Sequence, residues 1–186
     1  MSAKKIVITG GPSTGKTSLI KGLQNAGHFC YPEVIRQMTL EAKDKGALIN
    51  LNTNPIAAVS NPLDFNRKIL DARLAHYKDS LQLKDSINFF DRGMPDVLAY
   101  MTYYKQSHPK EFISIVKKSA YDMVFVLPMW RDIFVQDDER FESYEDALKI
   151  HDCLVQTYNE LNYDVIEVPK YSIQERLEFI LQKLKG

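Results

Sequence analysis

The residues best suited to chemistry are eight consecutive ones near the N-terminus, Gly10-Gly11-Pro12-Ser13-Thr14-Gly15-Lys16-Thr17. They fit the pattern of a glycine, four residues and then Gly-Lys-Ser/Thr, which defines a phosphate-binding loop. Such a loop aims successive backbone N–H groups at an anion, and the helix behind it adds the positive end of its dipole. Lys16 can then reach the β- and γ-phosphates, and the Thr17 hydroxyl can ligate magnesium. We therefore predict a nucleoside triphosphate site built from these residues and from Ser18, which follows them.

The residues around this loop support the prediction. Residues 5–9 read as a buried strand, and residues 18–23 open a helix. A glycine-rich turn between strand and helix that binds nothing is the alternative. The match of strand, loop and helix to the motif's required context favours the phosphate site.

The rest of the chain alternates strands with helices. Further strands are expected at 28–31, 86–91, 121–127 and 164–168, and helices at 16–26, from 34, from 64, from 94, at 109–118, at 144–161 and from 173. We expect Asp64, Ser143 and Ser172 to be N-caps. This alternation predicts an α/β fold with a parallel sheet covered on both faces, and ligands bound at the carboxyl ends of its strands.

Composition is consistent with one domain spanning residues 1–186. The chain is 45% hydrophobic and 26% charged, which is ordinary for a globular protein. Its formal net charge is zero, so no general attraction to nucleic acid or to an anionic membrane is expected. The two cysteines, Cys30 and Cys153, fit a reduced compartment. No apolar run reaches about 18 residues, and the N-terminus leads directly into the first expected strand, so we expect no leader and a cytoplasmic protein.

One long stretch, residues 46–63, interrupts the alternation. It contains asparagines and prolines but no charged residue. Long loops in compact domains are usually functional, and we expect this one on the acceptor side of the site.

Absent motifs narrow the class of phosphate-loop protein. The sequence has no Asn-Lys-x-Asp stretch to read guanine and no Leu-Ser-Gly-Gly-Gln transporter signature. One helix follows the fifth expected strand, so we do not expect the helical lid domain of a motor ATPase. A small-molecule kinase remains.

Three segments carry a resemblance to a known group. The phosphate loop, Phe89-Phe90-Asp91-Arg92-Gly93-Met94-Pro95-Asp96 and Gln136-Asp137-Asp138-Glu139-Arg140-Phe141-Glu142 resemble compact AAA-type ATP-binding domains related to the ribosylnicotinamide-kinase domain of NadR. TRPL-translocation-defect proteins belong to the same group. The resemblance runs nearly end to end. It implies a P-loop fold of the nucleoside- or nucleotide-kinase type with strand order 2-3-1-4-5.

Asp91 and Arg92 are candidate site residues at the end of one expected strand. The resemblance places that strand beside the first, which brings the Asp91 carboxylate near Thr17 to hold magnesium. Asp91 could instead cap the following helix through the amides of Gly93 and Met94. Arg92 could clamp a phosphate through bidentate contacts, or it could form a structural ion pair.

Glu33 follows the second expected strand. Related nucleoside kinases place at this position the carboxylate that accepts a proton from the substrate hydroxyl, and Arg36 could orient it. The alternative is an acid that favours the N-terminus of the next helix.

Residues 129–142 lie where kinases of this fold carry a lid over the phosphates. Arg140 is the first choice for contacting the transferred group and Arg131 the second, and a solvated charged loop is the alternative. Trp130, Phe141 and Tyr144 could stack on a base or belong to the core. The four histidines show no metal-ligand spacing.

Together these residues predict an ATP-dependent phosphotransferase acting on a nucleoside- or nucleotide-like small molecule. ATP and Mg²⁺ would be held by the phosphate loop and Asp91, with Glu33 as the base and Lys16, Arg92 and Arg140 stabilising phosphoryl charge. The alternative is a regulatory nucleotide-binding module or a slow ATPase or GTPase without a small-molecule acceptor.

Overall fold

The computed structural model describes residues 3–38, 61–83, 87–135 and 142–185. Some of the expectations fall elsewhere in the chain. Arg140, Phe141, residues 46–60 of the uncharged loop and residues 136–141 of the lid-like segment lie outside the described residues.

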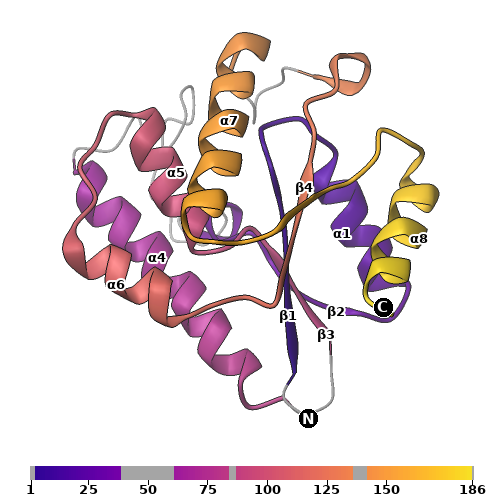
Figure 1. The fold of residues 1–186 in the computed structure, drawn as a ribbon, viewed down its shortest axis with the longest axis horizontal. Coiled ribbons are helices and arrows are strands. Elements are labelled where there is room, and N and C mark those ends of the chain that lie inside the picture. Colours follow the sequence, from indigo (N-terminus) through magenta and orange to yellow (C-terminus); the bar gives the residue numbers. More distant parts are fainter. Residues whose placement is uncertain (1–2, 39–60, 84–86, 136–141, 186) are drawn as a thin grey trace, which may run out of the picture.

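The core of the fold is one five-stranded parallel sheet with the order β2-β3-β1-β4-β5 (Figure 1). This is the predicted fold class and strand order. The three inner strands, β3, β1 and β4, come from apolar runs that are largely buried, as expected for a parallel sheet covered on both faces, whereas the outer strand β5 is only half-buried or exposed. The strands are β1 (Lys4–Gly10), β2 (Phe29–Tyr31), β3 (Ile87–Asp91), β4 (Met123–Leu127) and β5 (Val165–Glu167).

Helices cover the two faces of the sheet in two groups (Figure 1). On one face Ile6 and Ile8 of β1 pack with residues of α1 and α8; on the other, Val7 packs with residues of α4, α5, α6 and α7. Residues 34–38 are also helical. The helices are α1 (Lys16–Asn25), α4 (Pro62–Ser80), α5 (Pro95–Tyr103), α6 (Lys110–Lys118), the 3₁₀ helix η1 (Arg131–Ile133), α7 (Tyr144–Glu160) and α8 (Ile173–Lys183).

The strand register brings the predicted site residues to one edge. Ile8 pairs with Asp91 across β1 and β3, and Gly10 pairs with Leu127 across β1 and β4. All strands run in the same direction, so the phosphate loop after β1 and the Asp91-Arg92 pair after β3 emerge together. The sheet therefore places the phosphate loop beside Asp91.

The predicted N-cap of α4 is wrong. Asp64 lies within the helix, and the cap is Asn61, whose side chain accepts a hydrogen bond from the Asp64 amide. Pro62 occupies the first turn, where its missing N–H and fixed φ suit a helix start. The helix thus takes Pro62 and Leu63 from the expected loop.

The other two predicted caps are confirmed. Ser143 accepts from the Asp146 amide at the start of α7, and Ser172 and Glu175 form a capping box on α8. The fourth strand is shorter than the predicted 121–127, because the Asp122 carboxylate accepts the Lys5 amide at 2.6 Å and β4 begins one residue later. Within the described residues, no helix has the length and apolarity to cross a membrane.

Candidate functional site

The backbone of the phosphate loop has positive φ angles at three positions, two of which are glycines. Gly10 and Gly15 have φ of 147° and 87°, in the region that glycine favours. A Cβ on Gly10 would lie 2.6 Å from the Leu127 carbonyl oxygen, so a residue with a side chain at this position would clash with the backbone of β4. Ser13, at φ 57°, completes the reversal before α1.

Lys16 lies across the loop that it follows. Its ammonium group donates hydrogen bonds to the carbonyl oxygens of Gly10 at 2.8 Å and Gly11 at 2.6 Å. Burial, together with the nearby Arg92 charge, lowers the pKa of Lys16 to about 7, although Asp91, Asp96 and Glu33 oppose the shift. A bound anion would favour the charged form of this group.

Asp91 is a half-buried acid whose Oδ1 is buried and has no hydrogen-bond partner. Burial raises the pKa of Asp91 above its ordinary value, although the charges of Lys16 and Arg92 act in the opposite direction. The two amides that it was expected to cap are used by other groups. The Gly93 amide donates to Asp96, and the Met94 amide donates to the Tyr121 hydroxyl.

The Asp91 carboxylate and the Thr17 hydroxyl are hard oxygen donors, which suit Mg²⁺. The described residues hold no cluster of three or more His, Cys, Asp or Glu side chains able to bind a metal by themselves. This is compatible with Mg²⁺, which commonly takes one or two protein ligands and completes its shell with phosphates and water. The free Oδ1 of Asp91 fits such a role.

Arg92 forms the ion pair that was its alternative role. Its Nη1 donates to Asp96 at 3.0 Å and to the Gly10 carbonyl at 3.3 Å, and its guanidinium lies 5.3 Å from the centre of the Tyr100 ring. The residue has φ 75°, a strained conformation for a side chain of this size. It therefore connects the loop after β3 to the phosphate loop.

Asp96, on α5, is fully buried and accepts four hydrogen bonds. Besides Arg92, its donors are the Thr9 hydroxyl at 2.6 Å, the Tyr158 hydroxyl at 2.6 Å and the Gly93 amide at 3.0 Å. Burial alone would raise the pKa of Asp96, but its positive neighbours and hydrogen-bond donors hold it below the ordinary value. The carboxylate stays charged and ties β1 to α5 and α7.

Glu33 lies at the start of the helical segment after β2. Its Oε2 accepts from the Arg36 amide at 2.9 Å, so it caps that helix. Its Oε1 pairs with Arg73 of α4 at 3.3 Å, and Arg73 also donates to the Gly93 carbonyl at 2.9 Å. The helix-start role is thus present, and the same carboxylate is also linked to the loop after β3.

The start of the lid-like segment packs against itself and the phosphate loop. Arg131 lies 4.8 Å from the centre of the Tyr144 ring, and Tyr144 contacts Phe134 edge to face. The Ser13 hydroxyl donates to the Val135 carbonyl at 2.6 Å. Trp130 and Tyr144 are half-buried, and each ring lies beside an arginine side chain, Arg176 for Trp130 and Arg131 for Tyr144.

Sequence reasoning missed several buried polar residues of this site. Asp96 belongs to one of the segments that carry the family resemblance, and its spacing of four residues from Arg92 suits an ion pair within a helical turn. Arg73 and Tyr158 carry no local signal, because their partners are distant in sequence. Arg176, which donates to the Thr14 carbonyl at 3.2 Å, is equally remote.

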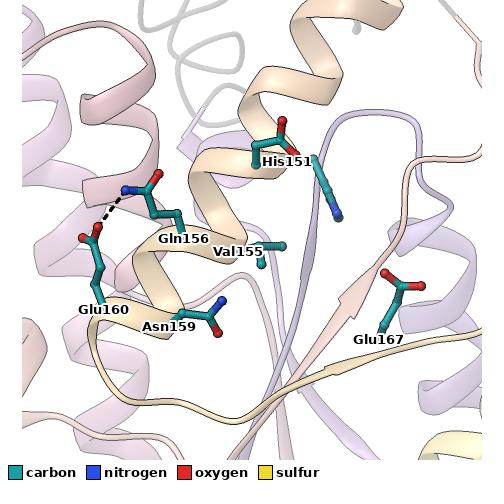
Figure 2. Close-up of a pocket in the computed structure, with 7 residues that line it drawn as sticks. His151, Val155, Gln156, Asn159, Glu160 and Glu167 are labelled. Atoms are coloured by element: carbon teal, nitrogen blue, oxygen red, sulfur yellow. Dashed lines mark hydrogen bonds between the residues drawn. The ribbon is translucent and has the colours of Figure 1, made fainter.

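A hollow of about 480 Å³ lies between α7 and β5, and His151, which lines it, lies 3.4 Å through its Cβ from a Cβ placed on Gly11. Figure 2 shows the His151 ring pointing from α7 toward the sheet and the Glu167 carboxylate rising from β5. The Nδ1 of His151 is buried without a partner, and burial lowers the pKa of His151. Gln156 and Glu160 are hydrogen-bonded to each other at 2.7 Å along the same helix.

Solved structures share this architecture at low sequence identity. NadR in complex with NAD and AMP-PNP matches with a TM-score of 0.67 and 15% identity over 98% of this chain and 49% of that one. The chain thus spans about half the length of NadR. Deoxyadenosine kinase from M. mycoides with bound dATP matches with a TM-score of 0.65 and 15% identity, covering 98% and 100% of the two chains. Thymidylate kinase from Candida albicans gives 0.66 and 14%, covering 99% and 92%.

These likenesses show a P-loop fold of the nucleoside- and nucleotide-kinase type. A search of curated proteins by sequence found no match. A family model described as an AAA domain matches residues 5–176, which is most of the sequence and includes the phosphate loop, Asp91 and Arg176. On that match, the chain belongs to the AAA-domain family.

Proposed function

We propose that this protein is an ATP-dependent phosphotransferase acting on a nucleoside- or nucleotide-like small molecule. The observation that supports it best is the gathering of Lys16, Glu33, Asp91 and Arg92 at one edge of the sheet, close enough for their charges to shift the pKa of Lys16 and of Asp91. Opposite charges of this kind, converging on a phosphate loop, suit a reaction in which phosphate is positioned and its charge stabilised.

In this proposal the donor half is the phosphate loop. Gly10 to Ser18 would surround the triphosphate, with Lys16 on the β- and γ-phosphates. Thr17 and Asp91 would hold Mg²⁺, which neutralises phosphate charge when bound. Arg92 reaches the loop already through the Gly10 carbonyl, at 3.3 Å.

The acceptor half is the Glu33 side. With a hydroxyl acceptor, Glu33 takes the hydroxyl proton while the oxygen bonds to the γ-phosphorus. The bond from that phosphorus to the β–γ bridging oxygen breaks, and ADP leaves. Arg92 and Arg140 would stabilise the charge on the transferred group. NadR, deoxyadenosine kinase and thymidylate kinase, which share the fold, add support to a phosphotransferase assignment.

The competing assignment is a regulatory nucleotide-binding module or a slow hydrolase. A switch needs the donor half alone, whereas a kinase also needs a base on the acceptor side. The Glu33–Arg73 ion pair, linked through Gly93 to the loop after β3, favours the kinase. It holds the Glu33 carboxylate beside the loop that carries Asp91 and Arg92, and we propose that the acceptor is bound there.

The test is a screen of nucleosides and nucleotides for ADP release above the background without acceptor. With an active acceptor in hand, Glu33→Gln should lower turnover about 10²- to 10⁴-fold and leave ATP affinity nearly unchanged. Glu178→Gln, an exposed site on α8, is the matched control and should have no effect. If no acceptor stimulates ADP release by the unmodified protein, the regulatory module becomes the better assignment.

A further inference from the structure

Arg176 is a buried cation to which the proposed reaction assigns no role. It lies in the first turns of α8, and only 1% of its surface is exposed. Its Nη1 donates to the Thr14 carbonyl of the phosphate loop at 3.2 Å. Its guanidinium lies 5.0 Å from the centre of the Trp130 ring, just before η1. The side chain therefore joins α8, the phosphate loop and the start of the lid-like segment.

Among the described residues, no acid forms an ion pair with Arg176. Its Nε and Nη2 are buried and have no hydrogen-bond partner among these residues. The adjacent Glu175 is engaged with Ser172 in the capping box. Burial accordingly lowers the pKa of Arg176. An unpaired buried charge is costly, and such groups normally have a counter-ion.

The position of Arg176 indicates which anion would balance it. Its Nη1 would lie 3.2 Å from a Cβ placed on Gly15, so the guanidinium sits directly against the last turn of the loop. Lys16 holds the other end of the loop through the carbonyl groups of Gly10 and Gly11. Lys16 and Arg176 thus donate hydrogen bonds to carbonyl groups at the two ends of the phosphate loop, whose N–H groups suit an anion.

We propose that Arg176 is a positioning residue of the nucleotide site. It fixes the Thr14–Gly15 turn in its anion-binding conformation, and its positive charge is balanced by the bound polyphosphate. The inference rests on the nucleotide-binding part of the proposed function and is independent of any acceptor.

This arrangement has an unusual consequence for stability. Because the charge is buried with no counter-ion in the part of the chain that the structure describes, Arg176→Met should leave the free energy of unfolding of the free protein unchanged or raised, since Met keeps the apolar stem against Trp130. Affinity for ATP and for inorganic tripolyphosphate should fall together by about tenfold. This is the effect of one unit charge about 10 Å away at an effective dielectric constant of about 20.

The experiment measures binding by calorimetry and unfolding by urea for four proteins: unmodified, Arg176→Met, Arg176→Lys and Lys183→Met. Arg176→Lys retains the charge and should recover most of the affinity. Lys183→Met removes an exposed charge from the same helix and should change neither quantity. Tripolyphosphate is the decisive probe, because it lacks a base and reports on the phosphate subsite alone.

Two outcomes overturn the inference. Arg176→Met could lose stability, or fail to fold, which would make Arg176 an ordinary packing residue. Alternatively, it could bind tripolyphosphate and ATP as tightly as the unmodified protein. If the unmodified protein binds neither ligand, the proposed function itself fails, and that result is distinct from failure of Arg176 alone.

Discussion

The Glu33 carboxylate lies 3.3 Å from the Arg73 guanidinium, and this ion pair joins the segment after β2 to the middle of α4. Arg73 also donates to the Gly93 carbonyl, so the same guanidinium contacts the loop that carries Asp91 and Arg92. The position of the proposed base is therefore set by residues that are remote in sequence.

Breaking this pair should be costly. Arg73 is 4% exposed, so Glu33→Gln leaves a buried cation without its partner, and we expect a loss of about 3 kcal/mol in the free energy of unfolding. The double variant with Arg73→Met should lose less than the sum of the two single losses. Urea unfolding of the four proteins measures the coupling. The exposed pair Arg67–Glu111, taken through the same cycle, should show little coupling. Additive losses at Glu33 and Arg73 would show that the pair contributes nothing.

Nucleotide binding should take up protons at mildly alkaline pH. The pKa of Lys16 is lowered to about 7, chiefly by burial and then by Arg92. At pH 8 much of the free protein therefore has a neutral Lys16, and a bound triphosphate favours the ammonium form. Calorimetry of ATP binding in buffers of different ionisation enthalpy measures this uptake. It should vanish in Lys16→Ala, which should also bind ATP far more weakly while remaining folded. Unchanged ATP affinity in that variant would contradict the proposed donor site.

The same lysine should make the stability of the free protein depend on pH. The unfolded chain holds this proton up to its ordinary pKa of 10.5, and the folded protein only up to about 7. The free energy of unfolding should therefore rise as pH increases from about 7 toward 10.5, because the unfolded state binds more protons in that window. Lys16→Met should flatten the slope measured by urea unfolding. An equal slope in the variant would assign it to other groups.

Asp91→Asn should separate stability from magnesium-dependent binding. Burial raises the pKa of Asp91, so the free energy of unfolding falls as pH rises from the ordinary pKa of 3.8 to the raised folded-state pKa. The neutral variant should be more stable than the unmodified protein at neutral pH. It should also lose most of the increase in ATP affinity that Mg²⁺ confers. Asp71→Asn, at an exposed position on α4, should change neither. Full magnesium dependence in Asp91→Asn would remove Asp91 from the metal site.

Asp96→Asn should be among the most damaging single changes. It leaves Arg92 buried without its ion-pair partner, for which we expect a loss of about 3–5 kcal/mol in the free energy of unfolding. Tyr158→Phe removes one neutral donor to the same carboxylate and should cost about 1–2 kcal/mol. Thermal or urea unfolding ranks the two. Equal losses would mean that the Arg92–Asp96 pair is not what stabilises this region.

Local sequence signals predicted the fold well. The apolar runs, the phosphate loop and the caps at Ser143 and Ser172 all depend on neighbours within a few residues, and the structure agrees with each. At α4 two local signals competed. Asn61 followed by Pro62 starts a helix better than Asp64 does, and the prediction chose the wrong one.

The site was predictable only in part. Glu33, Asp91 and Arg92 follow strands, and parallel strands deliver their ends to one edge. What these side chains contact depends on packing across the sheet. Arg73 reaches Glu33 from 40 residues away, and Arg176 reaches Thr14 from 162. Such pairs have no spacing that a single sequence reveals.

The buried carboxylate of Asp96 also fixes the distance between the segments that follow β1 and β3. Its donors come from Thr9 on β1, which leads into the phosphate loop, and from Arg92, which follows β3. Strands β1 and β3 are direct neighbours in the sheet, so no hinge lies between the phosphate loop after β1 and the Asp91-Arg92 pair after β3. In the proposed reaction, the core therefore fixes the distance between the phosphate loop and the bound acceptor. If the hydroxyl oxygen of a bound acceptor does not reach the γ-phosphorus, movement of these strands cannot bring the two together. We therefore expect the length of an acceptor to decide first whether it reacts, and its shape to matter second.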